Sequence, residues 1–510
     1  MKNHQFVMKI ASPIIVIILF VTVVLTSVYP ANNLVNIPLI ITCVIGLGII
    51  TGMFILYNKI YSRIAKIEPY LYWGLLVALG IALFVVSRTR TDVGAISNTD
   101  YVIISYSAGE YADGRYLEAG SFYERYFSYY TNNIRPMILM SWFFRVADFF
   151  HISRFYFLSG YSCLVVVATA WAIGYLVTDC NNKQLRLPAL LMFGLFLPLW
   201  CFTSAYYTDT MSMGLCTIAI ALTKMSILQK NNKRLVTICL SMLTAGLICF
   251  SMIWKITAVI PIIACILAFF SFENIIKHLK KIILIFISFV LIYASLWIVF
   301  QQYDIVKITQ NTGDPIISWV AIGMNGNGSW VDSHEYVMEL HSLNYTEDKI
   351  EFTQQYIMDN VDLFWNPSHL RSKLLFLFAD GNLNSSTYTT SADDGSWMWK
   401  VFDPYGDYFW RASQYSFVYI EIMYIFMLIG AIISMINVYR GKSVDRLTFS
   451  TFLSFAGIFV FLMVWEANSR QLYNQIPMLL LGEMLSIKMI VDFFMKKKKS
   501  YNCDMQKSAE

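Results

Sequence analysis

The sequence predicts an all-α, polytopic membrane protein, and three observations support this fold class. Apolar residues make up 57 % of the 510 residues and charged residues only 14 %. Soluble domains contain roughly 45–50 % apolar residues and about 25 % charged residues. The apolar residues gather in runs of about 17–22 residues, the length that crosses a hydrocarbon core of roughly 30 Å. Aromatic residues reach 16 %, as expected for belts at the membrane interfaces. An ordinary soluble enzyme and a disordered chain are both excluded.

The apolar runs predict about twelve transmembrane helices. The first run has no small-residue cleavage site behind it and a second run follows directly, so we interpret it as a retained helix and not as a signal peptide. The expected spans are 13–30, 37–57, 70–86, 155–177, 187–204, 209–227, 235–252, 257–272, 282–300, 416–438, 448–465 and 471–491.

The distribution of Lys and Arg predicts the orientation of these spans. Five short connectors and the C-terminal tail carry clusters of basic residues, and cytoplasmic loops are enriched in such clusters. All six clusters lie on one side if both termini are cytoplasmic, which predicts a multi-pass cell-membrane protein in contact with the lipid bilayer. The net charge of +5 comes from these clusters, so it does not indicate nucleic-acid binding. The clusters lie within 59–66, 183–186, 230–234, 277–281, 440–446 and 496–499.

Two long segments then face outward, from 87 to about 135 and from 301 to about 412. The first mixes apolar, aromatic and charged residues at helical spacings, which predicts amphipathic surface helices. The second is long enough for a large extracytoplasmic loop domain. Segment 136–150 is apolar but short and carries two charges, so we expect an interfacial or re-entrant helix. The predicted regions are 1–86, 87–150, 151–300, 301–415, 416–495 and a basic tail at 496–510.

Ionisable residues at the outer ends of the spans are candidates for function, because charges at membrane depth are costly. Asp100, Asp209, Lys255, Glu466 and Arg470 come from four loops that map to this one face. A carboxylate there is suited to take a proton from an acceptor hydroxyl. A cation at headgroup depth is suited to hold a lipid phosphate.

Each of these residues also has a purely structural interpretation. Asp209 follows Thr208 at the start of a span and is a possible helix cap, and Asp100 is another. Lys255 can extend its ammonium group towards the interface without binding anything. Glu466 and Arg470 are four residues apart and can form a mutual ion pair. A common functional site is favoured because all five residues are predicted to lie on the same side of the membrane.

The sequence predicts neither a disulfide framework nor a cofactor site. Most of the nine Cys lie inside apolar runs, and no CxxC or Cys/His ligand spacing occurs. No nucleotide-binding glycine pattern is visible. We expect no metal site, although a divalent metal remains open.

Several short motifs follow one another in a characteristic order. Asp100 opens an outer segment that contains Ala108, Gly109 and Glu110 and then Gly114-Arg115-Tyr116, and YYTNNIRPMILM closes it. Tyr207-Thr208-Asp209 then starts a span, and Lys255 and Thr257 form a Lys-x-Thr at an outer turn. The large outer segment carries Trp319, Gly323, Gly328 and Trp330, with Asp332 or His334, and Glu466 and Arg470 form a late Glu-x-x-x-Arg. In this order of features the chain resembles the C-type superfamily of membrane glycosyltransferases, which includes protein O-mannosyltransferases, and in particular a Gram-positive bacterial branch.

The resemblance implies a transferase of the hexosyltransferase type that uses a polyprenyl-phosphate-linked sugar. Its acceptor would be an extracytoplasmic glycan such as a teichoic acid, a wall polysaccharide or another lipid-linked saccharide. Asp100 would then be the general base, and Asp209 would support donor or acceptor as a second catalytic acid. The residues that we assign to substrate binding are Glu110, Arg115, Lys255, Trp330, Glu466 and Arg470.

Other functions are compatible with the same sequence. The main alternative is a transporter or flippase for lipid-linked saccharides, which predicts polar residues near the middle of several spans. A polysaccharide polymerase would share the large outer loop, and a non-catalytic partner of a wall-synthesis complex is a further alternative. The candidate charges lie at the outer ends of spans, which favours chemistry at the membrane surface.

Overall fold

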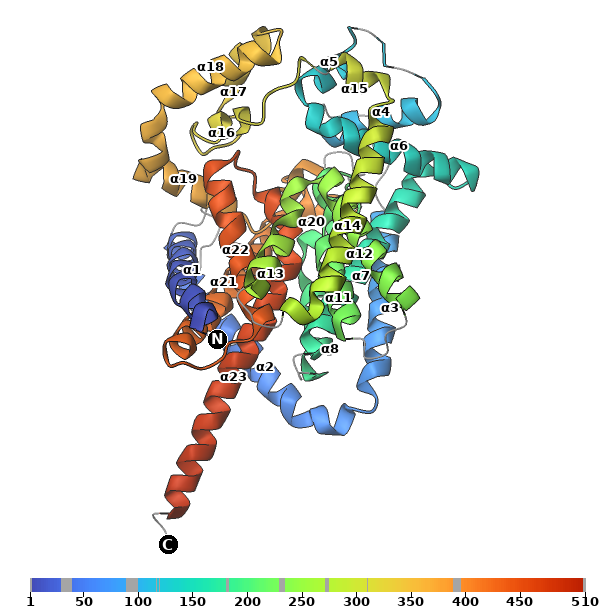
Figure 1. The fold of residues 1–510 in the computed structure, drawn as a ribbon. Helices are drawn as coiled ribbons and strands as arrows, with labels where there is room; N and C mark the ends of the chain where they lie inside the picture. Colours follow the sequence, from blue (N-terminus) through green and yellow to red (C-terminus); the bar gives the residue numbers. More distant parts are fainter. Residues whose placement is uncertain are drawn as a thin grey trace.

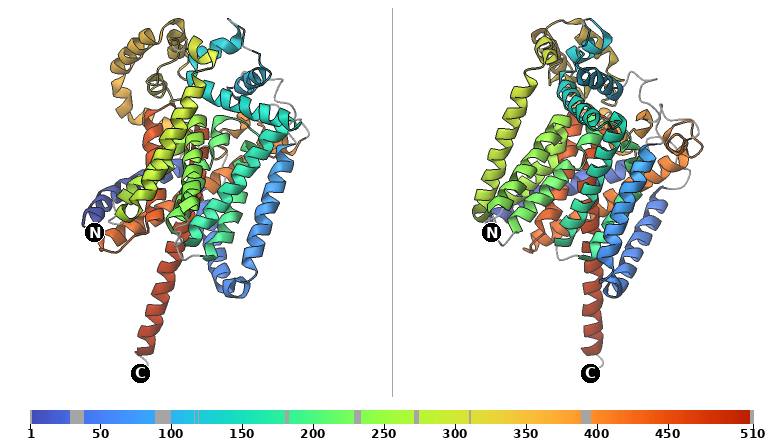
Figure 2. Two further views of the ribbon diagram at one scale, coloured as in Figure 1. Left: turned by 45° about the vertical axis from the view of Figure 1, so that its right-hand side comes forward. Right: turned by 90° about the vertical axis from the view of Figure 1, so that its right-hand side faces the viewer.

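The fold is a bundle of long helices with a layer of short helices at one end (Figures 1 and 2). Every regular element within the described ranges is a helix, and these ranges contain no strand. The all-α prediction is therefore confirmed for this part of the chain. The computed structural model describes residues 2–28, 39–88, 100–115, 117–118, 120–179, 183–228, 234–270, 275–309, 311–388 and 396–507.

Nine helical segments in the described ranges are long and apolar enough to cross a membrane. This confirms a polytopic membrane protein and corresponds to nine of the twelve expected spans. The segments are formed by α1 (Lys2–Val28), α2 (Leu39–Ile64), α3 (Glu68–Ser87), α7 (Arg154–Asp179), α10 with α11 (Thr208–Ser212 and Leu215–Leu228), α12 (Arg234–Trp254), α14 (Ile275–Phe300), α21 (Phe409–Tyr439) and α22 (Arg446–Val464).

The other three expected spans have a different form. Span 187–204 is divided into α8 (Arg186–Leu195) and α9 (Pro198–Phe202), because Phe196 is extended and Pro198 cannot donate a helical hydrogen bond. Span 257–272 becomes η3 (Ile256–Val259) and the short α13 (Ile260–Phe270). Span 471–491 begins as η6 (Ser469–Gln475) and continues as the long α23 (Ile476–Lys507), whose apolar stretch is interrupted by charged residues.

The first outer segment folds into helices at the upper end of the bundle (Figure 1). These are α4 (Asp100–Ala112), α5 (Phe122–Tyr129), η1 (Thr131–Asn133) and α6 (Ile134–Phe149). With 16 residues, α6 is not among the candidate spans. It packs against α4 and α7, and its shortness agrees with the expectation that 136–150 is not a full span.

The second outer segment contains a small lobe with its own hydrophobic core. Ala321, Ile322, Tyr336, Val337 and Leu340 form this core. The helices of the segment are α15 (Asp304–Ile308), α16 (Ser318–Ile322), α17 (His334–Ser342), α18 (Thr346–Asp359), η4 (Val361–Trp365), α19 (Pro367–Phe378), η5 (Ser385–Tyr388) and α20 (Trp397–Phe402).

Contacts through Asp314 join the lobe to the first outer segment. The Asp314 backbone N–H donates to the Tyr129 carbonyl at 2.9 Å. The Asp314 carboxylate binds His341 Nε2 at 2.8 Å and Lys349 Nζ at 2.9 Å. The His341 ring stacks on Tyr129, with 3.8 Å between the ring centroids. The two outer segments therefore form one continuous layer.

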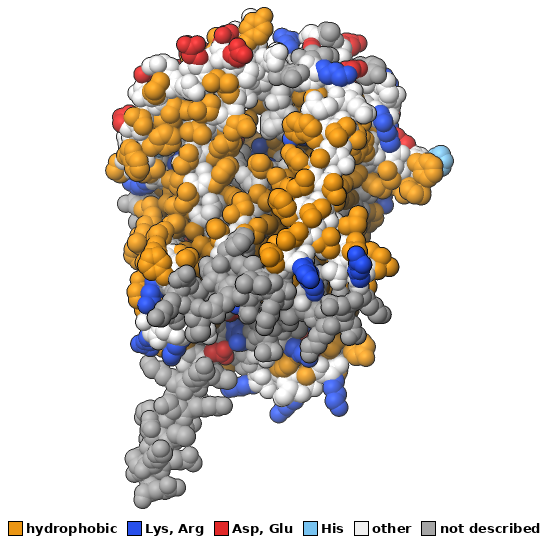
Figure 3. Space-filling view, viewed as in Figure 1, with side chains coloured by type: hydrophobic (Ala, Val, Ile, Leu, Met, Phe, Trp, Pro, Cys, Tyr) orange, Lys and Arg blue, Asp and Glu red, His pale blue; other side chains and the backbone are white. Residues whose placement is uncertain are grey.

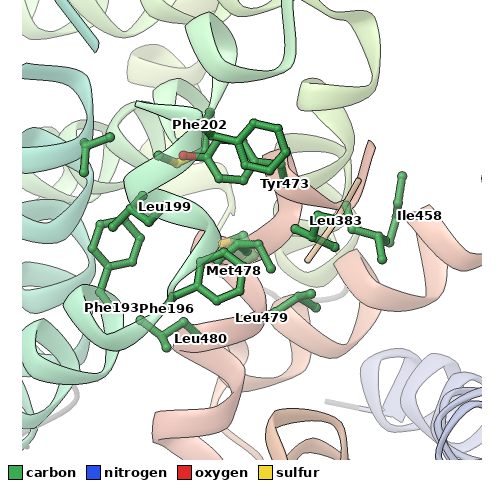
Figure 4. Packing of buried hydrophobic residues seen from close by; sticks show 14 of the residues in the cluster. Phe193, Phe196, Leu199, Phe202, Leu383, Ile458, Tyr473, Met478, Leu479 and Leu480 are labelled. Atoms are coloured by element: carbon green, nitrogen blue, oxygen red, sulfur yellow. The ribbon is translucent and has the colours of Figure 1, made fainter. Parts of the chain in front are cut away.

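The main core lies directly under this layer. Figure 4 shows side chains of α8 and α9 packed against the beginning of α23, with Phe202 beside Tyr473. Their ring centroids are 4.4 Å apart. This packing fixes η6 and the first turns of α23 against the segment that precedes α10, and both segments contribute to the site described below.

Charged side chains gather at the two ends of the molecule, on either side of a broad apolar band (Figure 3). Most of the visible Asp and Glu lie at the end that carries the short helices, together with some Lys and Arg, and Lys and Arg predominate at the opposite end. The assignment of these ends to the outside and the cytoplasm stays a prediction from the positive-inside rule.

Candidate functional site

Four of the predicted charged side chains meet at the junction of the bundle and the outer layer. Asp100 begins α4, Asp209 lies in α10, Lys255 lies between α12 and η3, and Arg470 lies in η6. Lys255 Nζ is 3.2 Å from Asp209 Oδ1. Arg470 reaches both carboxylates, with 3.6 Å from Nη2 to Asp100 Oδ2 and 3.6 Å from Nε to Asp209 Oδ2. Residues 370 positions apart in the sequence thus form a single cluster.

Asp209 is the buried centre of this cluster, and only 1 % of its side chain is exposed. Its carboxylate binds Lys255 and also accepts a hydrogen bond from Asn474 Nδ2 at 3.1 Å. Ser212 Oγ donates to Asn474 Oδ1 at 2.8 Å and so fixes the amide. The helix-cap interpretation of Asp209 is wrong, because Tyr207 occupies the N-cap position of α10.

Asp100 is more accessible, with 37 % of its side chain exposed. Its two carboxylate oxygens accept hydrogen bonds from the hydroxyls of Tyr126, at 3.0 Å, and Tyr207, at 2.9 Å. Asn133 Nδ2 donates to the Tyr126 hydroxyl at 2.6 Å. The Arg470 guanidinium lies over the Tyr207 ring, 4.7 Å from its centroid. The Asp100 carboxylate is thus fixed in orientation while one side remains open to solvent.

A local break in the chain brings Tyr207 and Asp209 to this place. The predicted span 209–227 is interrupted between α10 and α11 at Gly214, whose φ is +78°. Glycine adopts this backbone conformation without the steric cost that a side chain brings. A Cβ at position 214 would also collide with the Thr169 side chain of α7. The short α10 can therefore turn its polar residues towards Asn474 and Lys255.

Glu466 lies beside the same cluster in the connector between α22 and η6. Its side chain is half-buried, and no donor from the described part of the chain forms a hydrogen bond with its carboxylate. Burial raises the pKa of Glu466 to about 6. The charges of Arg470 and Lys255 oppose this shift, and those of Asp100 and Asp209 add to it. The ion pair expected between Glu466 and Arg470 is not formed, since Arg470 faces the two aspartates.

A glycine-rich loop, residues 323–332, packs against the Glu466 connector. The Ala467 N–H donates to the Gly328 carbonyl at 2.7 Å. Lys373 of α19 is fully buried and donates from Nζ to the Gly323 carbonyl at 2.6 Å. Burial lowers the pKa of Lys373 to about 7, and Glu466 opposes this shift. The loop is thereby held against the site.

This loop places an aromatic group near Asp100. Trp330 has 37 % of its surface exposed, and its Nε1–H donates to the Tyr130 hydroxyl at 3.2 Å. The Tyr130 ring is 5.0 Å from the Tyr126 ring, whose hydroxyl binds Asp100. A row of aromatic rings therefore runs from Asp100 to the outer surface.

Two predicted binding residues lie apart from the cluster. Arg115 is 61 % exposed and pairs with Glu110 at 2.7 Å and with Asp113 at 2.8 Å. Within the described ranges no contact joins Glu110 or Arg115 to Asp100 or Arg470. These ranges also contain no group of three His, Cys, Asp or Glu side chains that could hold a metal ion.

Sequence reasoning missed four residues that complete the site. Tyr126, Tyr207 and Asn474 bind the two aspartates, and Lys373 holds the loop beside Glu466. One signal was present for Asn474, since the run SRQLYNQ at the start of an apolar span is unusually polar. Tyr207 stands in the Tyr207-Thr208-Asp209 motif. Tyr126 and Lys373 give no such signal, because single Tyr and Lys residues at membrane interfaces are common.

Comparison with known sequences gives a family for the whole chain. Residues 3–491 match the family described as "Conserved hypothetical integral membrane protein". The chain belongs to this family. No curated protein and no solved structure matches it. The family description agrees with the membrane-spanning helices and leaves the activity to be inferred from the site.

Proposed function

We propose that the protein is a membrane glycosyltransferase that moves a sugar from a polyprenyl-phosphate donor to an extracytoplasmic glycan. The observation that carries this proposal is the convergence of Asp100, Asp209, Lys255 and Arg470 at the end of the bundle. Two cations at the membrane surface suit a lipid phosphate, and an accessible carboxylate beside them suits an acceptor hydroxyl. The order of sequence motifs that resembles C-type glycosyltransferases supports the same function.

In this proposal Lys255 and Arg470 bind the donor phosphate. The two Arg470 contacts to carboxylates are 3.6 Å long, whereas charge-assisted hydrogen bonds measure about 2.7–2.9 Å. The Arg470 guanidinium thus lies between the carboxylates of Asp100 and Asp209, 3.6 Å from each. A phosphate oxygen that approached both cations would stabilise the negative charge that develops on the leaving group.

Asp100 and Asp209 take different roles because their exposure differs. Asp100 is 37 % exposed and is accessible to an acceptor hydroxyl, so it is the general base. Asp209 is 1 % exposed and binds Lys255 and Asn474, so it positions the cations. In the transfer, the acceptor oxygen bonds to the anomeric carbon as its proton passes to Asp100. The bond from that carbon to the phosphate oxygen breaks, and the phosphate keeps the electron pair.

A label-transfer assay tests the proposal. Membranes that contain the protein are incubated with a prenyl-phosphate hexose labelled in the sugar, and label that lipid solvents no longer extract is counted. Lys255→Ala should reduce transfer about 10- to 100-fold, since a charge-assisted bond to phosphate contributes roughly 1.5–3 kcal/mol. Lys307→Ala is the matched control, because Lys307 is 61 % exposed and pairs with Asp304. If the wild type and Lys255→Ala transfer label at the same rate, Lys255 does not bind the donor phosphate.

A transporter or flippase of lipid-linked saccharides is the second candidate, and two buried acids favour it. Glu421 of α21 accepts hydrogen bonds from Thr26 and Ser27 of α1, both at 2.6 Å. Glu483 of α23 is fully buried, and neither of its carboxylate oxygens has a hydrogen-bond partner among the residues that the structure describes. Acids within membrane helices often belong to transport pathways. Movement of the labelled lipid across a vesicle bilayer without transfer of label would favour this candidate.

A further inference from the structure

A short loop, residues 380–384, contacts the segment that carries Arg470. The loop follows α19 and precedes η5. The Ser469 hydroxyl donates to Asp380 Oδ2 at 2.6 Å, and only 2 % of Ser469 is exposed. Ser469 is the residue directly before Arg470 in η6. A buried hydrogen bond therefore joins the loop to the neighbour of a proposed phosphate-binding cation.

The Asp380 carboxylate also holds the loop in its conformation. Its Oδ1 accepts a hydrogen bond from the Asn382 N–H at 3.1 Å, and its Oδ2 accepts one from the Asn384 N–H at 2.6 Å. Leu383 and Asn384 have φ angles of 51° and 57°. Residues other than glycine keep such angles only where the surrounding structure holds them. One carboxylate thus fixes a constrained loop and Ser469 together.

Two of the long helices fix the position of this loop. A Cβ at Gly381 would collide with the backbone of Phe417 in α21, so the loop and α21 are in close contact. Leu383 is fully buried, and Figure 4 shows it beside Ile458 of α22. The place of the Asp380 carboxylate is therefore set by the packing of the loop against α21 and α22.

The position of the Arg470 guanidinium is sensitive to the backbone from which it extends. Its contacts with Asp100 and Asp209 measure 3.6 Å each, whereas charge-assisted hydrogen bonds measure about 2.7–2.9 Å. Contacts of this length constrain a side chain less than short bonds do. The short bond at Ser469 limits the movement of η6, and so it limits the movement of Arg470.

We propose that Asp380 is a positioning residue of the donor-phosphate site, which acts through Ser469 to hold Arg470 where a lipid phosphate binds. This inference rests on the proposed function, because it takes an anionic lipid phosphate as the ligand of Arg470. Asp380 does not touch the ligand. It orders the backbone beside the cation before the ligand arrives, which lowers the cost of ordering on binding.

Two substitutions weaken the link in different ways. Ser469→Ala deletes one hydroxyl and leaves Asp380 with its two backbone donors. Asp380→Asn has a single oxygen acceptor, so it cannot accept all three hydrogen bonds where the carboxylate accepts them. In both variants η6 is held less firmly, so Arg470 should bind an anion less well. A neutral lipid of the same shape does not depend on the charge of Arg470.

The test therefore compares two lipids that differ in charge, hexahydrofarnesyl methyl phosphate and its neutral dimethyl ester. Their binding to the purified full chain in nanodiscs is titrated at neutral pH, and empty nanodiscs correct for partitioning into the bilayer. The measured quantity is the ratio of the two affinities, called the anion preference. Arg470→Ala should lower the anion preference roughly 10- to 100-fold. Ser469→Ala and Asp380→Asn should each lower it about 3- to 10-fold.

A double-variant cycle shows whether the effect passes through Arg470. Ser469→Ala combined with Arg470→Ala should have the same anion preference as Arg470→Ala alone, because the guanidinium that Ser469 positions is gone. Ser318→Ala is the matched control. Ser318 of α16 is 1 % exposed, and its hydroxyl donates to the Pro315 carbonyl at 2.7 Å. Its loss should leave the wild-type anion preference unchanged.

The outcomes separate failure of this inference from failure of the proposed function. A wild-type anion preference in Ser469→Ala or in Asp380→Asn overturns the inference alone, and if one of these variants does not fold, the other decides. An equal loss in Ser318→Ala, or a further loss when Ser469→Ala is added to Arg470→Ala, also overturns it, because the effect is then general. A wild type that binds both lipids equally overturns the inference and the proposed phosphate site together.

Discussion

Replacing Asp100 with asparagine removes the proposed proton acceptor and leaves the shape of the side chain nearly unchanged. The hydroxyls of Tyr126 and Tyr207 donate to the two Asp100 oxygens. The asparagine oxygen accepts one of these bonds, and the other hydroxyl can rotate to accept from the amide group. Asparagine also caps helices as well as aspartate does. The substitution therefore isolates the loss of the base.

The expected loss of rate is much larger than the expected loss of stability. The Arg470–Asp100 contact measures 3.6 Å and Asp100 is 37 % exposed, so the pair contributes at most about 1 kcal/mol. General base catalysis contributes about 10²- to 10⁴-fold in rate, which corresponds to roughly 3–5 kcal/mol of activation free energy. We expect Asp100→Asn to lower sugar transfer by this factor while its unfolding temperature stays close to that of wild type.

The assay follows transfer of label from a prenyl-phosphate hexose, with thermal unfolding measured on the same preparation. Asp304→Asn is the matched control, because Asp304 is 57 % exposed and lies in α15, where it pairs with Lys307. Transfer by Asp100→Asn within threefold of wild type would refute the reasoning. Asp100 would then be a hydrogen-bonding group of the site, and its role as base would be lost.

Two further predictions concern the centre of the site and the orientation of the chain. Asp209→Asn leaves Lys255 and Arg470 without the carboxylate between them, so we expect the free energy of unfolding to fall by ~2–4 kcal/mol. Denaturant titrations measure this loss, and a value below ~1 kcal/mol would contradict a stabilising buried ion pair. In intact cells, an impermeant thiol reagent should label Glu347→Cys on the outer lobe and leave Lys59→Cys unlabelled, and the opposite pattern would reverse the topology.

Much of the bundle could be predicted from the sequence because membrane spans obey a simple rule of length and polarity. The three spans that differ from the prediction do so for local reasons. Pro198 divides one run into two short helices. The 3₁₀ helices η3 and η6, which carry polar side chains, take up the beginnings of the other two runs, ahead of α13 and α23. Hydropathy averaged over a long window does not resolve such breaks.

The candidate site was predictable only in part. Asp100, Asp209, Lys255 and Arg470 lie at the ends of spans on one predicted side, and such residues can meet when the helices pack together. Tyr126 could not be assigned, because its contact with Asp100 depends on how α5 folds back over α4. Contacts of that kind are tertiary, and no spacing in the sequence encodes them.

The same limitation applies to Glu110 and Arg115, whose role in substrate binding stays a prediction. The motif order places them shortly after Asp100, but α4 carries Glu110 almost three helical turns away from Asp100. Arg115 then finds its nearest acids, Glu110 and Asp113, within its own segment. Glu110 and Arg115 are close to Asp100 in the sequence but lie apart from the charged cluster in the structure.

The buried carboxylate of Asp209 suggests how the site stays assembled before a donor arrives. Lys255 and Arg470 would repel each other if no anion lay between them, and both are largely withdrawn from water, with 20 % and 16 % of their side chains exposed. Asp209 supplies that anion, and Asn474 and Ser212 hold it in place. A donor phosphate can then add to cations that are already positioned, which lowers the ordering cost of binding. On this reasoning Asp209 fixes the geometry of the cations and Asp100 accepts the proton. Asp209→Asn should therefore mainly lower the stability of the protein, and Asp100→Asn should mainly lower the rate of sugar transfer.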